Sequence, residues 1–168
     1  YAVTKLSGEY YCGMFAAEGR LATTCLRYFN VFGPRQDPGS QYAAAVPIFV
    51  SRALKGETIT IFGDGEQTRD FIYVKDIVAA NAFFATHQDM GGVYNVAYGG
   101  SITINDLATR IVELTGSSSE IAHAPERAGD VKHSRAAVER LAATGFEPTS
   151  DFDAGLAKTV DFFRAKWA

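Results

Sequence analysis

The 168-residue chain lacks the features that mark several classes of protein. Its longest apolar run is short and contains a proline, whereas a membrane-spanning helix needs roughly 20 apolar residues. Its 19 Asp and Glu residues outnumber its 16 Lys and Arg residues, which leaves a net charge of −3. Such a chain has no broad basic field to hold a nucleic-acid backbone. The sequence therefore predicts neither a membrane nor a nucleic acid as its partner.

Cysteine is also scarce, and the two cysteines that are present fit no metal-ligand spacing, so we expect no metal site. Cys12 lies in a helical pattern and Cys25 in a strand pattern. This arrangement favours two buried free thiols and leaves a disulfide as the alternative. Free thiols are typical of a reducing compartment, so the expected location is the cytoplasm.

Two features often found near the start of a chain are missing. There is no dinucleotide-binding loop of the form Gly-x-Gly-x-x-Gly and no charged-then-apolar signal segment. The first residue is Tyr1 rather than Met, and a helical pattern begins there at once. Natural domains rarely begin inside a helix, so we expect the chain to be a fragment of a longer protein.

The composition is that of an ordinary globular domain. The chain is 47% hydrophobic and 21% charged, which excludes a disordered or collagen-like protein. Hydrophobic periodicity predicts helices over 1–18, 43–54, 74–86, 103–115, 135–142 and 152–166, and strands over 21–31, 58–62, 68–73, 93–96 and 121–124. The expected fold class is therefore α/β, without the strict alternation of a complete doubly wound sheet.

Tyr1 and Lys5 form the first candidate catalytic pair. Because they are four residues apart on an expected helix, the phenol and the ammonium lie on one face. A nearby cation favours the phenolate, which can act as a base. Tyr and Lys at this spacing also occur by chance in many helices, so the pair alone is weak support for catalysis.

Asn30 adds a second signal, because it lies at the end of a buried strand. Ligands of α/β sheets bind at the carboxyl ends of strands, although a simple turn is the alternative role for this residue.

Tyr-x-x-x-Lys followed by Arg-Tyr-Phe-Asn-Val-Phe-Gly-Pro resembles the extended short-chain dehydrogenase/reductase family. The resemblance is to its NAD-dependent epimerases and dehydratases, which act on nucleotide sugars.

Three further segments resemble the same family and occur in the same order. Residues 63–76 contain Gly-Asp-Gly, then Arg-Asp-Phe, then Val and Asp. Residues 93–97 contain Tyr-Asn-Val, and residues 127–134 begin with Arg-Ala-Gly-Asp-Val. The resemblance therefore extends over almost the whole chain.

The resemblance implies an architecture in two parts. Residues 1–35 correspond to the C-terminal helix and strand of a Rossmann-like NAD domain, and residues 36–168 to a smaller mixed α/β domain that binds a nucleotide sugar. The two parts are interleaved in the family, so this boundary is approximate. In the family, the first half of the protein carries the glycine-rich NAD loop, most of the parallel sheet and a catalytic Ser or Thr. The implied cofactor is NAD, with most of its site outside this chain, and the implied partner is a UDP-sugar.

The resemblance also assigns roles to individual residues. Tyr1 is the catalytic base, and Lys5 holds the nicotinamide ribose and favours the phenolate. Two neighbouring apolar residues line the nicotinamide pocket, namely Phe29 and Val31. Asn30 contacts the sugar or its phosphate, and Ala44 lies where the family contacts the hexose.

Arg69 and Arg127 match the nucleotide-binding arginines of the family. A planar guanidinium suits phosphate oxygens, because it presents a fork of donors. Surface ion pairs with Asp70 and Asp130 are the alternative.

Ser134 matches the position that faces the 2-substituent of the hexose in the family. A small residue there leaves room for an N-acetyl group, which implies that an N-acetylated sugar is accepted. The alternative role of Ser134 is to cap a helix that begins near Arg135.

Helix 1–18 corresponds to a helix that helps form a two-fold homodimer in the family. Its aromatic residues are Tyr10, Tyr11 and Phe15, and packing onto the chain's own sheet is their alternative role.

Two polar residues mark expected helix starts, because Asp76 opens helix 74–86 and Thr103 can cap helix 103–115.

The whole resemblance implies an NAD-dependent nucleotide-sugar 4-epimerase, present as a C-terminal fragment that is inactive alone. A nucleotide-sugar 4,6-dehydratase or a UDP-glucuronate decarboxylase would share the Tyr-Lys pair, and the residues that distinguish them lie outside this chain. A non-enzymatic remnant that binds only a nucleotide is the further alternative.

Overall fold

The computed structural model of the protein describes residues 1–40, 44–87 and 89–167. Within them the helices are α1 (Ala2–Ala17), α2 (Ala45–Leu54), α3 (Val74–Thr86), α4 (Ile104–Thr115), α5 (Glu139–Ala142) and α6 (Phe152–Trp167). The strands are β1 (Thr24–Tyr28), β2 (Val31–Phe32), β3 (Ile59–Phe62), β4 (Thr68–Arg69), β5 (Ile72–Tyr73), β6 (Gly92–Val96), β7 (Ile102–Thr103), β8 (Ile121–Ala124) and β9 (His133–Ser134). The predicted α/β fold class is confirmed. Ala43, the expected start of the second helix, lies outside the described residues.

The described strands form four small sheets. β1 pairs with β6, β2 with β5 and β3 with β8, each time in parallel. β4 lies between β7, which is antiparallel to it, and β9, which is parallel. The paired strands are far apart in the sequence, because two parallel strands can be joined only by a long crossover.

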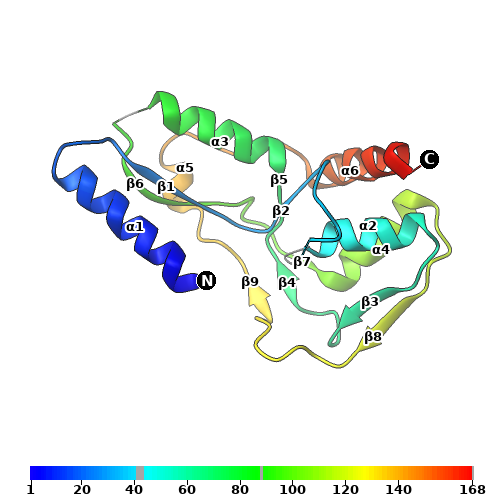
Figure 1. The fold of residues 1–168 in the computed structure, drawn as a ribbon. Coiled ribbons are helices and arrows are strands. Elements are labelled where there is room, and N and C mark those ends of the chain that lie inside the picture. The colour runs from blue at the N-terminus through cyan, green and yellow to red at the C-terminus, as the bar shows by residue number, and fades with distance from the viewer. Residues whose placement is uncertain (41–43, 88, 168) are drawn as a thin grey trace.

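The described residues form two hydrophobic cores, and the elements that build them are labelled in Figure 1. The larger core joins α2, α4, α6 and β3, and its fully buried members include Val50, Ile59, Leu107 and Phe163. The smaller core joins α3, α5, β5 and β6, with residues of β1 and β2 packed against it. This smaller core combines residues from before and after position 35, so the two expected parts are interleaved. The boundary at residue 35 stays a prediction.

Two of the expected strands are interrupted. The strand expected over 21–31 divides into β1 and β2, because consecutive residues bond to different neighbours. The Phe29 N–H donates to the Val96 carbonyl at 3.1 Å, whereas the Asn30 carbonyl accepts from the Ile72 N–H at 3.2 Å. The strand expected over 68–73 divides into β4 and β5 around Asp70. The chain therefore passes from one sheet to the next at these breaks.

The helix expected over 135–142 begins only at Glu139. The Ala136 N–H donates to the Asp70 carboxylate at 3.2 Å, which holds this segment outside a helix. Ser134 belongs to β9, where it pairs with Arg69. The predicted alternative role of Ser134 as a helix cap is therefore wrong.

The start of α4 is as the sequence predicts. The Thr103 hydroxyl oxygen accepts from the N–H of Asp106 at 3.0 Å, which satisfies one of the free donors of the first turn. Asp76 lies in the first turn of α3. Across the described ranges, every helix is too short or too polar to cross a membrane.

Candidate functional site

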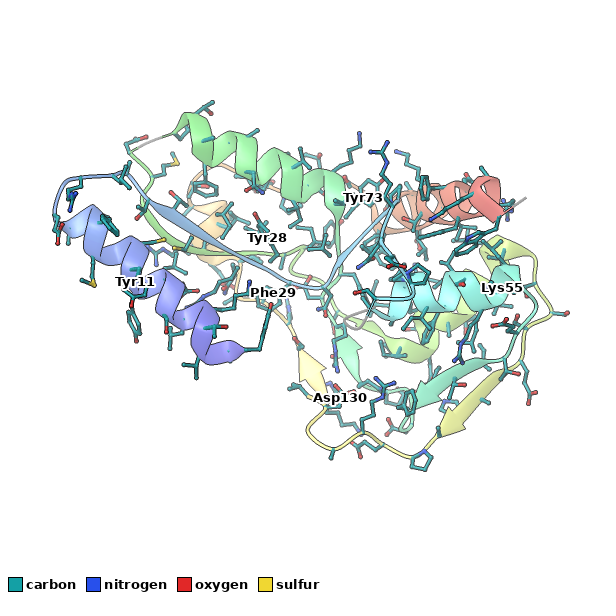
Figure 2. All side chains as sticks on the ribbon, in the orientation of Figure 1. Tyr11, Tyr28, Phe29, Lys55, Tyr73 and Asp130 are labelled. Carbon is teal, nitrogen blue, oxygen red and sulfur yellow. The ribbon has the colours of Figure 1, made fainter. Side chains whose placement is uncertain are left out.

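A cavity of about 310 Å³ lies between α2, β3, β4 and the segment after β8. Four of the five predicted substrate-binding residues line it, namely Asn30, Ala44, Arg69 and Arg127. These residues are up to 97 positions apart in the sequence (127 − 30 = 97), so the fold and not local sequence brings them together. Asp130, on the same segment as Arg127, also lines the cavity and is labelled in Figure 2.

The two arginines of the cavity have different partners. The Arg127 guanidinium lies over the Phe62 ring, 3.7 Å from its centroid, and makes no ion pair among the described residues. Arg69 is ion-paired with Asp130 and also donates to the Val131 carbonyl at 2.6 Å. Of the ion pairs predicted as the alternative, one forms, between Arg69 and Asp130, while Arg127 forms none among the described residues.

Several further cavity residues were missed by the sequence analysis, among them Thr60, Phe62 and Arg52. Phe62 and Thr60 are on the face of β3 opposite to the buried Ile59 and Ile61, and the alternation of this strand could have identified them. Arg52 reaches across from α2, where it donates to the Thr60 hydroxyl at 2.8 Å. No local pattern distinguishes this arginine from one on a solvated helix face.

Asn30 lines the cavity and also fixes the break between β1 and β2. Its side-chain amide donates to the Asp70 carbonyl at 2.9 Å. The alternative role of Asn30 in a turn is therefore compatible with its position at the cavity.

Asp70 has a fully buried carboxylate beside the cavity. The carboxylate accepts from the N–H groups of Tyr98 and Gly99 at 3.1 Å and of Ala136 at 3.2 Å. Burial raises the pKa of the Asp70 carboxyl, and the three N–H donors oppose that rise. Asp70 makes no ion pair with Arg69 in the described structure, so that predicted alternative is wrong. Its carboxylate instead joins the segments that come after β4, β6 and β9.

The Gly-Asp-Gly turn after β3 is fixed by Asn105 of α4. The backbone N–H of Asn105 donates to the Gly65 carbonyl at 3.1 Å, and its side-chain amide donates to the Asp64 carbonyl at 3.0 Å. Gly65 has a φ of 77°, and a Cβ there would lie 1.9 Å from the Asn105 side-chain oxygen. Only glycine fits this position, which explains the second glycine of the motif.

Ser134 is the one predicted substrate residue that does not line the cavity. It is half-buried in β9, in register with Arg69 of β4. The structure therefore places it beside a cavity residue and not in the cavity wall.

Tyr1 and Lys5 line a separate open hollow of about 660 Å³ between α1 and β1. The Lys5 ammonium lies 5.4 Å from the centroid of the Tyr1 ring, as expected for residues one helical turn apart. Tyr1 is 86% exposed. The predicted catalytic pair therefore shares one face of α1, and its phenol is accessible.

The hollow and the cavity are joined by one short stretch of chain. Tyr28 lines the hollow and Asn30 lines the cavity, and two residues of extended chain span about 7 Å. Phe29 lies between them and is half-buried, while Val31 packs against the smaller core. The structure does not bring Phe29 or Val31 into the wall of the hollow that holds Tyr1 and Lys5.

The aromatic residues of α1 are exposed. Tyr10, Tyr11 and Phe15 expose 67%, 64% and 41% of their surface, and α1 has no buried residue. Figure 2 shows Tyr11 directed away from the rest of the molecule. The predicted alternative, packing onto the chain's own sheet, is therefore wrong.

The chain belongs to the NAD dependent epimerase/dehydratase family, because the sequence profile of that family matches residues 1–97. The family uses NAD, as its description states. The resemblance drawn from the Tyr-Lys pair and the strand after it is therefore confirmed at the level of the family.

Several individual proteins are similar to the chain. A UDP-glucose 4-epimerase of Mycolicibacterium smegmatis is 38% identical over 99% of this chain and 53% of its own length. A UDP-N-acetyl-alpha-D-glucosaminuronate decarboxylase of Bacillus cytotoxicus is 34% identical over 98% of this chain and 53% of its own length. The solved structure of a UDP-N-acetylglucosamine 4-epimerase of Methanobrevibacter ruminantium in complex with UDP-N-acetylmuramic acid is 46% identical, with a TM-score of 0.93, over 99% of this chain and 54% of that one. The chain thus spans about half the length of these relatives.

Proposed function

We propose that the chain is the C-terminal part of an NAD-dependent nucleotide-sugar 4-epimerase. The observation that carries this proposal is the convergence of Asn30, Ala44, Arg69 and Arg127 on one cavity, two residues along the chain from the hollow of Tyr1 and Lys5. The similarity to epimerases over about half of their length supports it. In this proposal residues 1–35 complete the NAD domain, and residues 36–168 bind the nucleotide sugar.

The cavity suits a nucleoside diphosphate. Arg127 offers unpaired guanidinium donors, and Arg69 adds a second guanidinium, held in place by Asp130. A guanidinium matches the spacing of phosphate oxygens, so we assign the diphosphate of a UDP-sugar to this pair. Asn30 and Ala44 then contact the sugar or the phosphate nearest to it.

The residues of the hollow fit a nicotinamide cofactor. The Lys5 ammonium makes no ion pair among the described residues, so its donors are available to ribose hydroxyls. We propose Tyr1 and Lys5, with Phe29 and Val31 further along the chain, as the residues of this chain that contact NAD. We assign most of the NAD site to the part of the relatives that this chain does not span, about half of their length, and we propose that the 168-residue chain is inactive alone.

The proposed chemistry uses Tyr1 as the acid and base. When bound beside Tyr1 and Lys5, NAD⁺ would supply the hydride chemistry at C4 of the sugar. The Tyr1 phenolate oxygen removes the proton of the 4-hydroxyl and gives it back once the configuration at C4 is inverted. Lys5 places a positive charge beside the phenolate, one helical turn away.

A nucleotide-sugar decarboxylase or 4,6-dehydratase is the second candidate, favoured by the 34% identity to a decarboxylase. These enzymes share the first oxidation at C4 and differ in the later steps. The mass of the product distinguishes these enzymes from an epimerase. An epimer has the mass of its substrate, whereas the product of a decarboxylase or a dehydratase is lighter by carbon dioxide or by water.

We also propose that the active protein is a homodimer formed through α1. The support is the exposed apolar surface that Tyr10, Tyr11, Met14 and Phe15 present on one short helix. Monomeric proteins rarely leave a contiguous apolar patch of this kind in water.

Replacing Arg127 by Ala in the intact enzyme should weaken UDP binding by about 10- to 150-fold. The lost contact is a charge-assisted hydrogen bond, worth about 1.5–3 kcal/mol. Replacing Arg69 by Ala should also weaken binding, and it also removes the partner of Asp130. Calorimetric titration with UDP measures both effects.

Arg164→Ala is the matched control for these two variants. Arg164 is on α6, outside the cavity, and pairs with Asp161 on the surface. The control should bind UDP as the parent does, so unchanged affinity in the Arg69 and Arg127 variants as well would remove the phosphate assignment.

Replacing Ser134 by Tyr should reduce kcat/KM for UDP-N-acetylglucosamine relative to UDP-glucose by about 10- to 200-fold, the range that pocket fit alone supplies. The proposed reason is that the larger ring occupies the space of the acetamide. Ser134→Ala is the control, because it keeps the space and should keep the activity on the N-acetylated sugar. Full activity of the Tyr variant on that sugar would show that Ser134 does not select the substrate.

A further inference from the structure

Two interactions join α1 to β1 and to the residue before this strand, and the two residues involved, Thr23 and Arg27, are on the same face of the extended chain. The Thr23 hydroxyl donates to the Cys12 carbonyl at 3.0 Å. Arg27 donates through Nε and Nη2 to the two carboxylate oxygens of Glu9, at 2.6 Å each. Cys25 lies midway between Thr23 and Arg27. Because alternate residues of a strand share one face, the side chain of Cys25 is directed at α1.

Cys12 and Cys25 lie on the facing sides of this contact. Cys12 is three residues after Glu9, so its side chain is on the same face of α1 as Glu9, which contacts Arg27 of β1. Burial and the neighbouring Cys12 thiol raise the pKa of the Cys25 thiol. Both cysteines are free and half-buried, so a small reagent can reach them. Cys25 also lines the hollow that contains Tyr1 and Lys5.

We propose that Cys12 and Cys25 form a reversible redox site, at which oxidation by a small disulfide joins α1 to β1 through an internal disulfide. No residue of α1 is buried, so the helix has few other attachments to the rest of the described chain. The bond would therefore restrain the helix that carries Tyr1 and Lys5, and it would change the wall of their hollow.

The reaction proceeds by two thiol–disulfide exchanges. One protein thiolate attacks a sulfur of oxidised glutathione, forms a mixed disulfide and releases the first glutathione thiolate. The second protein thiolate attacks the protein sulfur of the mixed disulfide and releases the second glutathione. In total the two protein thiols lose two protons and two electrons, and one oxidised glutathione becomes two reduced molecules.

The test is to treat the purified, natively folded protein with oxidised glutathione and to measure its mass and its free thiols. The reaction is run at alkaline pH, because burial and the neighbouring Cys12 thiol raise the pKa of the Cys25 thiol. We expect the loss of both free thiols in a monomer whose mass falls by two hydrogen atoms. Trypsin cleaves after Lys5, Arg20 and Arg27, so the cysteines fall in separate peptides, 6–20 and 21–27. These two peptides should remain linked until a reductant is added.

Cys12→Ser and Cys25→Ser are the matched variants. Each should keep one thiol, which takes up a single glutathione and forms no internal link. Circular dichroism of both variants confirms that they remain folded. If the parent instead carries two glutathione adducts, forms only links between chains, or keeps both free thiols, the proposal is overturned. The measurement does not use enzymatic activity, so its outcome is independent of the proposed function.

Discussion

Replacing Tyr1 by Phe should lower kcat of the intact enzyme by about 10²- to 10⁴-fold and leave the affinity for the UDP-sugar nearly unchanged. The variant loses only the phenolic oxygen, which in the proposed mechanism moves a proton during the reaction. The UDP moiety is assigned to a different place, the cavity of Arg69 and Arg127, so ground-state binding should persist. Steady-state kinetics gives kcat, and calorimetry gives the affinity.

Tyr11→Phe is the control for this variant. Tyr11 is on the same helix and is 64% exposed, but it does not line the hollow. It should retain the activity of the parent. Near-parental turnover in Tyr1→Phe would rule out Tyr1 as the catalytic base, while a loss of activity in both variants would indicate damage to α1.

Replacing Asp70 by Ala should lower the free energy of unfolding by about 3 kcal/mol or more, because each buried N–H donor that loses its acceptor costs about 1–3 kcal/mol. The change leaves the N–H groups of Tyr98, Gly99 and Ala136 without their acceptor, at a position with no access to solvent. Asp70→Asn keeps one carbonyl oxygen as acceptor, so it should cost less. Urea denaturation of the intact protein measures both changes.

Asp161→Ala is the matched surface substitution. Asp161 pairs with Arg164 on α6 and is largely exposed, so its loss should change stability by no more than about 1 kcal/mol. A similarly small effect for Asp70→Ala would contradict the conclusion that its carboxylate joins three segments of the fold.

Local patterns in the sequence are sufficient for the elements that depend on local interactions. Helix α4 is an example, because an apolar stripe, the Thr103 cap and the glycine after it all lie within a short segment. The stretch 58–62 alternates, and β3 appears there. Arg127 could be found only because the chain resembles a family, whereas Asn30 is also marked by its place at a strand end. Nothing near either residue shows that they line the same cavity.

The parts that could not be predicted depend on long-range contacts. The segment 135–138 has helical composition, but Ala136 bonds to a carboxylate 66 residues earlier, and that contact prevents the first turn. β9 exists because residues 133–134 pair with β4, and a strand of two residues has no alternation to detect. Arg52 reaches the cavity only because α2 packs beside β3.

The most direct test of the central claim is to follow the fate of C4 in a nucleotide sugar. The intact enzyme is incubated with NAD⁺ and UDP-N-acetylglucosamine or UDP-glucose carrying deuterium at C4, and the product is examined by mass spectrometry and proton NMR. If the protein is an epimerase that returns the same hydrogen to the opposite face of the sugar, the product has the mass of the substrate. Its configuration at C4 is inverted, and the deuterium is still at C4. With UDP-glucuronate or UDP-glucose as substrate, a product lighter by carbon dioxide or by water would contradict the assignment and identify a decarboxylase or a dehydratase.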